Sequence, residues 1–226
     1  VAVFEKKRGP AAKLLLAGKS GLNVSNSRLD ASNYDGPLAR FQSLLKMFSV
    51  QDWLDFIKAL GVPTFKGTSQ RYFVEDLKAA PLLKNWIHML KEQGVEFYYG
   101  MELSDFNSTG NQVKLTFDEG NEWIGNAACF CLGGASWEPD ETPLRWPSIF
   151  TNKEVAFTSF TAANVGYEVS WSEDFLKEAE GLPIKNIILK SKLGEMPGEI
   201  MITRYGLEGT PVYSLKEPQT IVIDLK

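Results

Sequence analysis

The sequence has few of the residues on which catalytic and metal sites are usually built. Its 226 residues include one histidine and two cysteines. A single imidazole excludes catalytic designs that need two, and the spacing of Cys129 and Cys131 fits neither a CxxC redox pair nor a zinc pattern. Gly18-Lys19-Ser20 looks like the end of a phosphate-binding P-loop, but its first glycine is absent, so that motif is rejected.

The sequence also lacks an excess of charge and a long hydrophobic run. The formal net charge is −4, which gives no electrostatic reason to expect nucleic-acid or anionic-membrane binding. No run approaches the roughly 18–20 apolar residues that cross a bilayer. With 44% hydrophobic and 23% charged residues, the composition is that of an ordinary globular protein. We therefore expect contact with neither nucleic acid nor membrane, and the use of only two cysteines is in keeping with a cytoplasmic protein.

The cysteines and the histidine are predicted to have no catalytic role. Cys129 and Cys131 lie two apart in an apolar, strand-like run, where their side chains share one face and a disulfide would be strained. We expect two reduced, buried thiols, as is usual inside cells. His88 lies opposite the apolar face of a predicted helix, so it is expected to be solvated.

The first part of the chain alternates between predicted strands and helices. Residues 1–4 form a predicted buried strand that ends in Glu5, and residues 11–33 form a structured loop with a helical turn at 13–17. Asp35 is a predicted cap of a helix with Pro37 in its first turn. Ser49 and Asp52 form a predicted capping box for the next helix, which Gly61 ends. A longer helix is predicted for residues 78–93.

From residue 95 the hydrophobic period changes to two. Residues 95–99, 113–117 and 122–124 are predicted strands joined by turns at 109–111 and 119–121, and residues 127–132 a strand buried on both faces. Further strands are predicted at 165–169, 184–190, 199–203 and 220–225, with a helix capped by Ser172 after the first. These patterns predict two domains, residues 1–140 and 150–226, the second rich in β-structure.

Three segments carry residue types suited to a nucleotide cofactor. An acidic residue at the end of a strand, such as Glu5, can bind a ribose, although many strands end in a charge. The segment 13–26 combines small residues, neutral polar side chains and lysines, which suits a pyrophosphate or a flavin oxygen but also a surface loop. The glycine pair Gly133-Gly134 follows the apolar run, a weak signal by itself.

Taken in order, these segments resemble the BaiN-like NAD(P)/FAD-dependent flavoproteins, a bacterial family. The resemblance spans almost the whole chain and rests on Val3–Lys6, Lys13–Asn26, Gly67–Phe73, Lys78–Leu83, Leu132–Trp137 and Gly198–Gly209. It implies a mixed α/β fold: a glutathione-reductase-like, Rossmann-like FAD domain with a β-meander, interrupted by a barrel-like β-rich domain. It also implies FAD as cofactor and NAD(P)H as a candidate reductant.

The resemblance further implies roles for particular residues. Glu5 would hold the adenosine ribose, and Gly133 and Gly134 would pass near the adenine–ribose end. Arg71 matches the arginine of a family Gly-Arg-x-Phe motif, although Gln70 replaces the glycine. The residues expected to line the flavin or pyrophosphate are Lys13, Gly18, Gly21, Asn23 and Asn26.

The sequence departs from the family pattern at both ends. The first strand with its GxGxxG loop and the C-terminal return to the FAD domain are not among these residues, so we expect either an excerpt of a longer protein or a remnant gene. Two functions stay open: an FAD-dependent oxidoreductase or its core, with no acid–base residue singled out, and a non-catalytic binding or scaffold module that keeps the fold without the cofactor.

Overall fold

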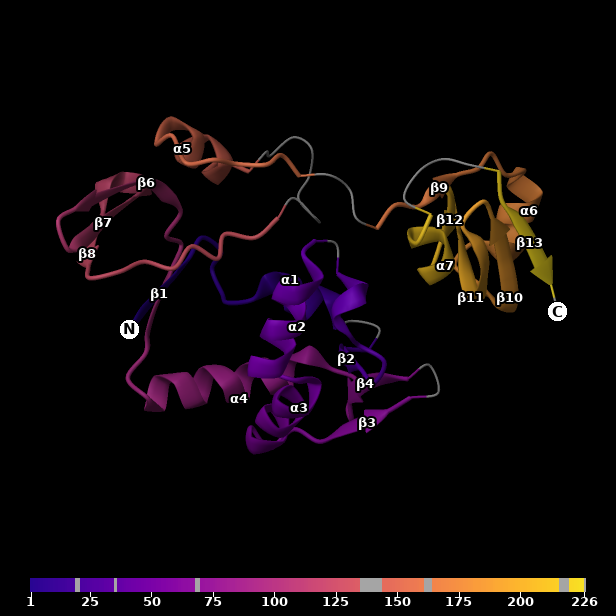
Figure 1. Cartoon of the computed structure of the whole chain (residues 1–226), viewed down its shortest axis with the longest axis horizontal. Helices are drawn as coiled ribbons and strands as arrows, with labels where there is room; N and C mark the ends of the chain where they lie inside the picture. The colour runs from indigo at the N-terminus through magenta and orange to yellow at the C-terminus, as the bar shows by residue number, and fades with distance from the viewer. Residues whose placement is uncertain are drawn as a thin grey trace. The chain divides into compact units, whose positions relative to one another are not determined.

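The chain folds into two compact units, Val1–Phe157 and Thr158–Lys226, in a computed structural model (Figure 1). The structure describes residues 1–18, 21–34, 36–67, 70–134, 144–160, 164–215 and 220–225. Among these residues, no helix is both long and apolar enough to cross a membrane. The mixed α/β class predicted from the sequence is confirmed, with helices and a meander in the first unit and mostly strands in the second.

A parallel pair of strands opens the first unit. β1 (Ala2–Glu5) pairs with β5 (Glu96–Tyr99), so that Glu5 lies opposite Tyr99 at their carboxyl ends. Phe4 packs on one side of this pair against Tyr98, with 5.2 Å between ring centroids, and against Phe117 of the meander at 4.6 Å. Val3 on the other side is 37% exposed. The strand predicted to be buried is therefore covered mainly on one face.

Four helices and a small antiparallel sheet lie around the main core of the first unit, and the second of these helices contributes no buried side chain to it. The helices are α1 (Ala12–Ala17), α2 (Leu38–Met47), α3 (Val50–Ala59) and α4 (Ala79–Glu92), with a 3-10 turn at Ala31–Asn33. The sheet has the order β2-β4-β3, with β2 (Asn23–Asn26), β3 (Thr64–Lys66) and β4 (Arg71–Val74). The buried cluster between them contains Leu22, Ile57, Leu60, Val62, Val74, Ala79 and Leu82.

The predicted helix ends are confirmed where capping chemistry fixes them. The Ser49 side chain accepts a hydrogen bond from the Asp52 amide, and the Asp52 side chain accepts from the Ser49 amide, which completes the capping box of α3. Gly61 after α3 and Gly94 after α4 have φ angles of 74° and 79°, the left-handed conformation that ends helices. Asp35, the predicted cap of α2, lies outside the described residues, and Pro37 is the residue before the helix.

A three-stranded meander completes the strands of the first unit and corrects two predictions. Its strands are β6 (Leu103–Thr109), β7 (Gln112–Phe117) and β8 (Glu122–Gly125), followed by α5 (Trp146–Asn152). The turn at 109–111 joins β7 to β6, not to β5, because polar residues along β6 weakened its apolar alternation. Residues 127–132 form no strand. Instead of pairing in a sheet, this segment packs through Phe130, whose ring contacts those of Phe106 and Phe150.

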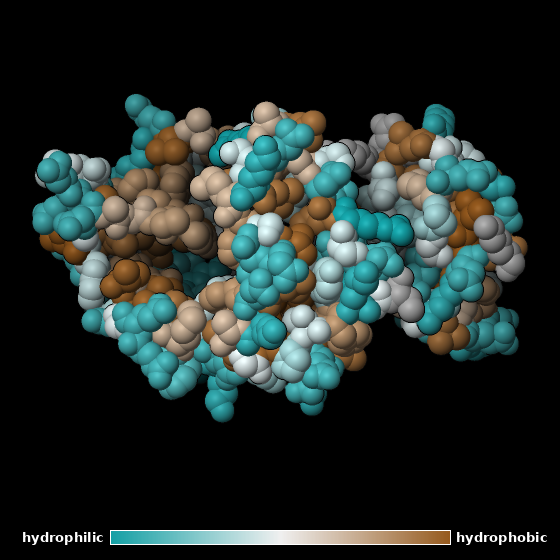
Figure 2. Space-filling model, turned by 60° about the horizontal axis from the view of Figure 1, so that its bottom comes forward, coloured by the Kyte–Doolittle hydropathy of each residue, from teal (hydrophilic) through white to brown (hydrophobic). Residues whose placement is uncertain are grey.

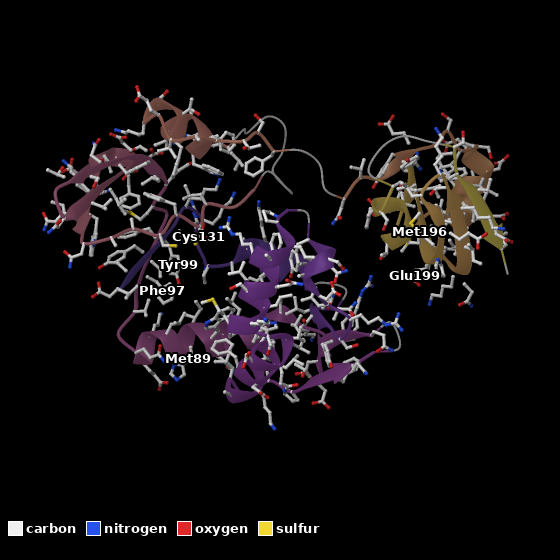
Figure 3. The ribbon with its side chains drawn as sticks, viewed as in Figure 1. Met89, Phe97, Tyr99, Cys131, Met196 and Glu199 are labelled. Atoms are coloured by element: carbon white, nitrogen blue, oxygen red, sulfur yellow. The ribbon has the colours of Figure 1, made fainter. Side chains whose placement is uncertain are left out.

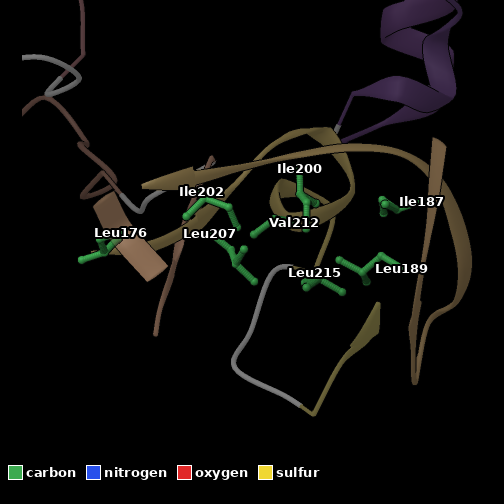
Figure 4. Packing of buried hydrophobic residues seen from close by; sticks show 8 residues of the cluster. All are labelled: Leu176, Ile187, Leu189, Ile200, Ile202, Leu207, Val212 and Leu215. Atoms are coloured by element: carbon green, nitrogen blue, oxygen red, sulfur yellow. The ribbon is translucent and has the colours of Figure 1, made fainter. Parts of the chain in front are cut away.

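One antiparallel sheet organises the second unit. Its order is β13-β10-β11-β12-β9, built from β9 (Tyr167–Glu168), β10 (Pro183–Ser191), β11 (Gly194–Thr203), β12 (Gly206–Glu208) and β13 (Val222–Leu225). Two helices accompany it, α6 (Glu173–Ala179) and α7 (Thr210–Tyr213), and Ser172 caps α6 as predicted. The core contains Leu176, Ile187, Leu189, Ile200, Ile202, Leu207, Val212 and Leu215 (Figure 4).

Apolar side chains also remain on the surface, where brown patches lie between hydrophilic ones (Figure 2). On α2, Leu38 is 51% exposed, Leu44 50% and Met47 78%, and none of the helix residues is buried. The apolar side chains of this helix are therefore half open to water.

Candidate functional site

The residues predicted to bind a cofactor all lie in the first unit and in its described part. Hydrogen bonding and strand pairing bring four of them together in two pairs, Lys13 with Gly134 and Asn26 with Arg71. Each pair joins segments that are far apart in the sequence.

Glu5 lies at the carboxyl end of β1, the edge at which parallel sheets bind ligands. Its Oε1 accepts a hydrogen bond of 2.8 Å from the Lys7 amide, which fixes the carboxylate close to the turn that leaves the strand. The Glu5 carbonyl accepts from the Met101 amide at 3.0 Å, just after β5. The side chain is half-buried, and its position suits a hydrogen-bond acceptor that faces a bound ligand.

Lys13 and Gly134 join the first helix to the glycine pair. The Lys13 Nζ donates a hydrogen bond of 2.9 Å to the Gly134 carbonyl across 121 residues of sequence. Gly133 has a φ angle of 78°, and a Cβ added there would meet no atom within 4 Å. The structure therefore sets a positive charge beside a segment of bare backbone, an arrangement that can accept an anionic group.

Gly18 and Gly21 have structural reasons to be glycines. A Cβ on Gly18 would lie 2.5 Å from the Ala79 Cβ, so the absence of a side chain lets α1 pack against the start of α4. Gly21 has a φ angle of 120°, a conformation that L-residues rarely adopt. The residues between them, Lys19 and Ser20, lie outside the described residues. The spacing of this loop is thus accounted for by packing and backbone shape as well as by any ligand.

Asn26 and Arg71 are cross-strand neighbours on β2 and β4. Directly opposite residues in an antiparallel pair have side chains on the same face, so an amide and a guanidinium lie next to each other there. The Asn26 Oδ1 accepts from the Arg28 amide at 2.8 Å, which orients the side chain at the end of its strand. Asn23 pairs with Phe73 at the other end of β2, beyond a register shift, and is exposed.

Gln70 occupies the position at which the resembling family has glycine. Its φ angle is 65°, in the left-handed region that glycine adopts freely. Ser27 holds it there: the Ser27 Oγ donates to the Gln70 Oε1 at 3.0 Å, and the Ser27 amide donates to the Gln70 carbonyl at 2.9 Å. Gln70 therefore gives the backbone immediately before Arg71 a left-handed conformation, which a glycine at this position would adopt freely.

The sequence analysis missed β2 and the contribution of Ser27. Residues 11–33 were predicted to be a loop because glycine, serine and asparagine dominate them. Leu22 and Val24 are apolar and alternate with Asn23 and Ser25, which is the period of a strand. The Val24 carbonyl accepts a 2.9 Å hydrogen bond from the indole of Trp53, which ties the strand to α3.

Three other predictions concern groups outside the two pairs. Cys129 and Cys131 are free but exposed, so their predicted burial is wrong, because residues 127–132 do not enter a sheet. His88 is solvated as predicted, with 74% of its side chain exposed. Trp137, the last residue of the segment Leu132–Trp137 that resembles the family, lies outside the described residues.

Two features of the described residues bear on other kinds of site. They contain no group of three or more histidine, cysteine, aspartate or glutamate side chains arranged to hold a metal ion. A surface pocket of about 410 Å³ lies beside α2, and none of the predicted cofactor residues lines it. At its edge, hydrogen bonds from the side chain and the backbone of Ser32 lower the pKa of the Asp30 carboxyl. That carboxyl caps the 3-10 turn, which is a structural role.

Comparisons with known proteins relate this chain to a family with a Rossmann domain and to a curated reductase. A family model described as "HI0933-like protein Rossmann domain" matches residues 1–168. The 3-dehydro-bile acid delta(4,6)-reductase of Clostridium scindens is 24% identical over 219 residues, which cover 95% of this chain and 53% of that protein. The chain thus spans about half the length of this curated relative. The solved structure of the Diels-Alderase PyrE3, from pyrroindomycin biosynthesis, matches with a TM-score of 0.39 at 13% identity, over 91% of this chain and 40% of that one.

Proposed function

The chain belongs to the HI0933-like family, and from this membership we propose that it is the FAD-binding core of a flavoprotein oxidoreductase. This family is the one that the sequence resembles through its BaiN-like motifs, and its curated relative is a reductase. We propose FAD as the cofactor and NAD(P)H as the reductant. Because the chain spans about half of that relative, activity is proposed for the protein of which these residues form the core.

The hydrogen bond between Lys13 and Gly134 is the observation that carries this proposal. It joins two of the segments on which the family resemblance rests. The Lys13 Nζ lies 2.9 Å from the Gly134 carbonyl oxygen, although the two residues are 121 positions apart in the sequence. An ammonium group beside two glycines lets the oxygens of a pyrophosphate approach the backbone closely while their charge is balanced. The donor and acceptor types present therefore fit a dinucleotide.

Each remaining residue has a proposed role that follows from its chemistry. Glu5, at the carboxyl end of β1, would accept hydrogen bonds from ribose hydroxyls. Arg71 and Asn26, side by side on β4 and β2, would donate to carbonyl oxygens of the isoalloxazine ring. Gly18, Gly21 and Asn23 would shape the loop that these groups flank. When bound, the flavin would supply the hydride or electron transfer, and the protein supplies orientation and electrostatics.

We propose reduction of a small organic molecule as the class of reaction. The relative is named as a delta(4,6)-reductase of a 3-dehydro-bile acid, which is a small organic molecule. We propose no narrower class of substrate, because the two proteins are 24% identical. At this identity, the residues that select a substrate differ between homologues far more readily than the residues that hold a cofactor.

Titration of the 226-residue chain with FAD, followed by flavin fluorescence, tests the proposal. We expect saturable 1:1 quenching, and we expect Lys13→Met to weaken it by about tenfold or more, since a hydrogen bond to a charged group contributes about 1.5–3 kcal/mol. Lys84→Met is the matched control, because Lys84 is an exposed lysine on α4. Circular dichroism of both variants checks that the fold is retained.

The result that would overturn the proposal is equally clear. If the chain quenches no flavin fluorescence and the complete protein purifies without flavin absorbance, the fold has been kept without the cofactor. The protein would then be a non-catalytic binding or scaffold module.

A further inference from the structure

Two thiols lie in contact on the segment that leads to the glycine pair. The Sγ atoms of Cys129 and Cys131 are 3.7 Å apart, and both cysteines are free and exposed. They are the only cysteines in the sequence. Figure 3 labels Cys131 on this segment. The contact joins residues two apart along a segment that forms no regular strand.

The residue between the thiols holds the segment in place. The ring of Phe130 packs against Phe106 and Phe150, with centroids 4.7 and 5.2 Å away. Phe130 is anchored by these rings, whereas the cysteines on either side of it are exposed. A second contact fixes the end of the segment, where the Gly134 carbonyl accepts from Lys13. The two thiols are therefore held together by the fold and not merely by their closeness in sequence.

A bond between the two sulfurs would close a very small ring. Residues two apart in a chain are at most about 7 Å apart at Cα, and a disulfide needs its Cα atoms within about 6.8 Å, so the bond is possible but strained. The sulfurs must move from 3.7 Å to about 2.05 Å. Strained and exposed disulfides have high reduction potentials and are the labile ones, so such a bond would form under oxidation and be reduced again readily.

We propose that Cys129 and Cys131 form a reversible redox pair that hydroperoxides oxidise to a disulfide. One thiolate attacks the peroxide oxygen, which gives a sulfenic acid and releases water or an alcohol. The second thiol then attacks that sulfur, the S–S bond forms and a water leaves. Overall two thiols lose two electrons and two protons, and the hydroperoxide is reduced. A low-molecular-weight thiol such as glutathione returns the pair to its reduced state by exchange.

Contact between the thiols also affects acidity. The hydrogen bond to Cys129 and the charge interaction with it, with a smaller contribution from burial, raise the pKa of the Cys131 thiol. Because either sulfur can donate in this hydrogen bond, either cysteine can make the first attack as the thiolate, and the other then resolves the sulfenic acid. This inference does not depend on flavin binding, since the pair, the oxidant and the reductant are all independent of the cofactor.

Oxidation of the whole 226-residue chain with one equivalent of hydrogen peroxide tests the inference. We expect two titratable thiols before treatment and none after it, a mass lower by two hydrogen atoms, and a Cys129–Cys131 crosslink in a non-reducing digest. Glutathione should restore both thiols. In Cys131→Ser, dimedone should trap a sulfenic acid on Cys129, because the resolving thiol is gone.

Two further measurements separate the folded pair from two neighbouring cysteines. The disulfide should form at least about tenfold faster in the native chain than in urea, since the fold holds the thiols in contact. Phenylarsine oxide should bind the reduced chain and neither single serine variant, because two thiols must each form a bond to one arsenic. Equal rates in native and unfolded chain, or disulfides only between chains, would overturn the proposal.

Discussion

The two units differ in how completely apolar side chains cover their β-sheets. In the second unit an antiparallel sheet of five strands buries eight apolar side chains in one cluster. In the first unit the parallel pair β1–β5 is packed by Phe4 and Tyr98 on one face, while Val3 and Tyr99 on the other are each 37% exposed. Its main core lies elsewhere, around α3 and α4.

This difference follows from how each sheet is connected. Antiparallel strands such as β10 and β11 are neighbours in sequence and pair through a short turn, so the sheet forms from local segments. Parallel strands β1 and β5 are separated by about 90 residues and need cover on both faces. The second unit is therefore expected to respond to changes in its sheet more strongly than the first unit responds to changes in β1.

Gly206→Ala should have the largest effect. Gly206 has a φ angle of 150°, and an added Cβ would lie 1.8 Å from the Tyr167 carbonyl oxygen, in backbone that cannot move aside. We expect a loss of at least about 5 kcal/mol, enough to unfold the second unit. Hydrogen exchange of β10 and β11 measures it. Gly181→Ala is the control, since its φ angle is 78° with no atom within 4 Å of the new Cβ, and should cost about 1 kcal/mol.

Truncation of one strand residue in each unit compares the two sheets directly. Leu189→Ala in β10 removes a fully buried side chain and should cost about 2–5 kcal/mol. Val3→Ala in β1 removes a side chain that is 37% exposed and should cost less than about 1 kcal/mol. Urea unfolding followed by circular dichroism measures both. Equal losses would contradict the view that the second sheet is the better covered.

The packing of α1 on α4 gives a test within the first unit. Gly18→Ala should cost about 1–3 kcal/mol, because its Cβ would lie 2.5 Å from that of Ala79. Ala79→Gly removes the opposing methyl group, so the double variant should be more stable than the sum of the single losses predicts. Thermal unfolding of the four proteins in the cycle measures this coupling. Strict additivity would mean that the two residues do not touch.

Acid should weaken the first unit through a small electrostatic effect. Hydrogen bonds to Ser32, Ser49, Lys153 and Arg145 lower the pKa values of four carboxyls in this unit: Asp30, Asp52, Asp105 and Asp118. A carboxyl whose folded pKa is depressed stabilises the fold above its unfolded pKa, near 4, and loses this contribution as the pH falls through the folded pKa.

Hydrogen exchange at neutral pH and below about pH 4 measures this effect. We expect protection of α3 and of the meander to fall with acid, and Asp52→Asn to reduce the pH dependence at α3 alone. Lys91→Gln serves as a charge control, since Lys91 is an exposed lysine in the last turn of α4. An unchanged pH dependence in Asp52→Asn would contradict the prediction.

The sequence predicted those parts of the fold that local chemistry determines. Ser49, Asp52 and Ser172 cap helices, and the strands predicted in the second unit overlap β9, β10, β11 and β13, whereas the short β12 was missed. Residues 127–132 were wrongly predicted to be a strand, because a short apolar run looks the same whether it pairs as a strand or packs through one ring such as Phe130.

The candidate site was predictable in its residue types but not in its pairs. Lys13 and Gly134 are suited to a phosphate group by composition, yet no local rule brings residues 121 positions apart together. Asn26 and Arg71 are neighbours because β2 pairs with β4, and β2 lies in a segment that was predicted to be a loop. The cofactor roles of these residues stay predictions until flavin binding is measured.

The left-handed backbone at Gln70 has a consequence for how this position can change over generations. Glycine reaches that conformation without strain, and glutamine reaches it with help from Ser27. Glycine and glutamine can therefore replace each other in a few mutations while Arg71 keeps its place. The condition is that Ser27 accompanies the glutamine and does no harm beside the glycine. A motif search that demands glycine before the arginine would miss such descendants, whereas a search that scores the Ser27–Gln70 combination as equivalent would recover them.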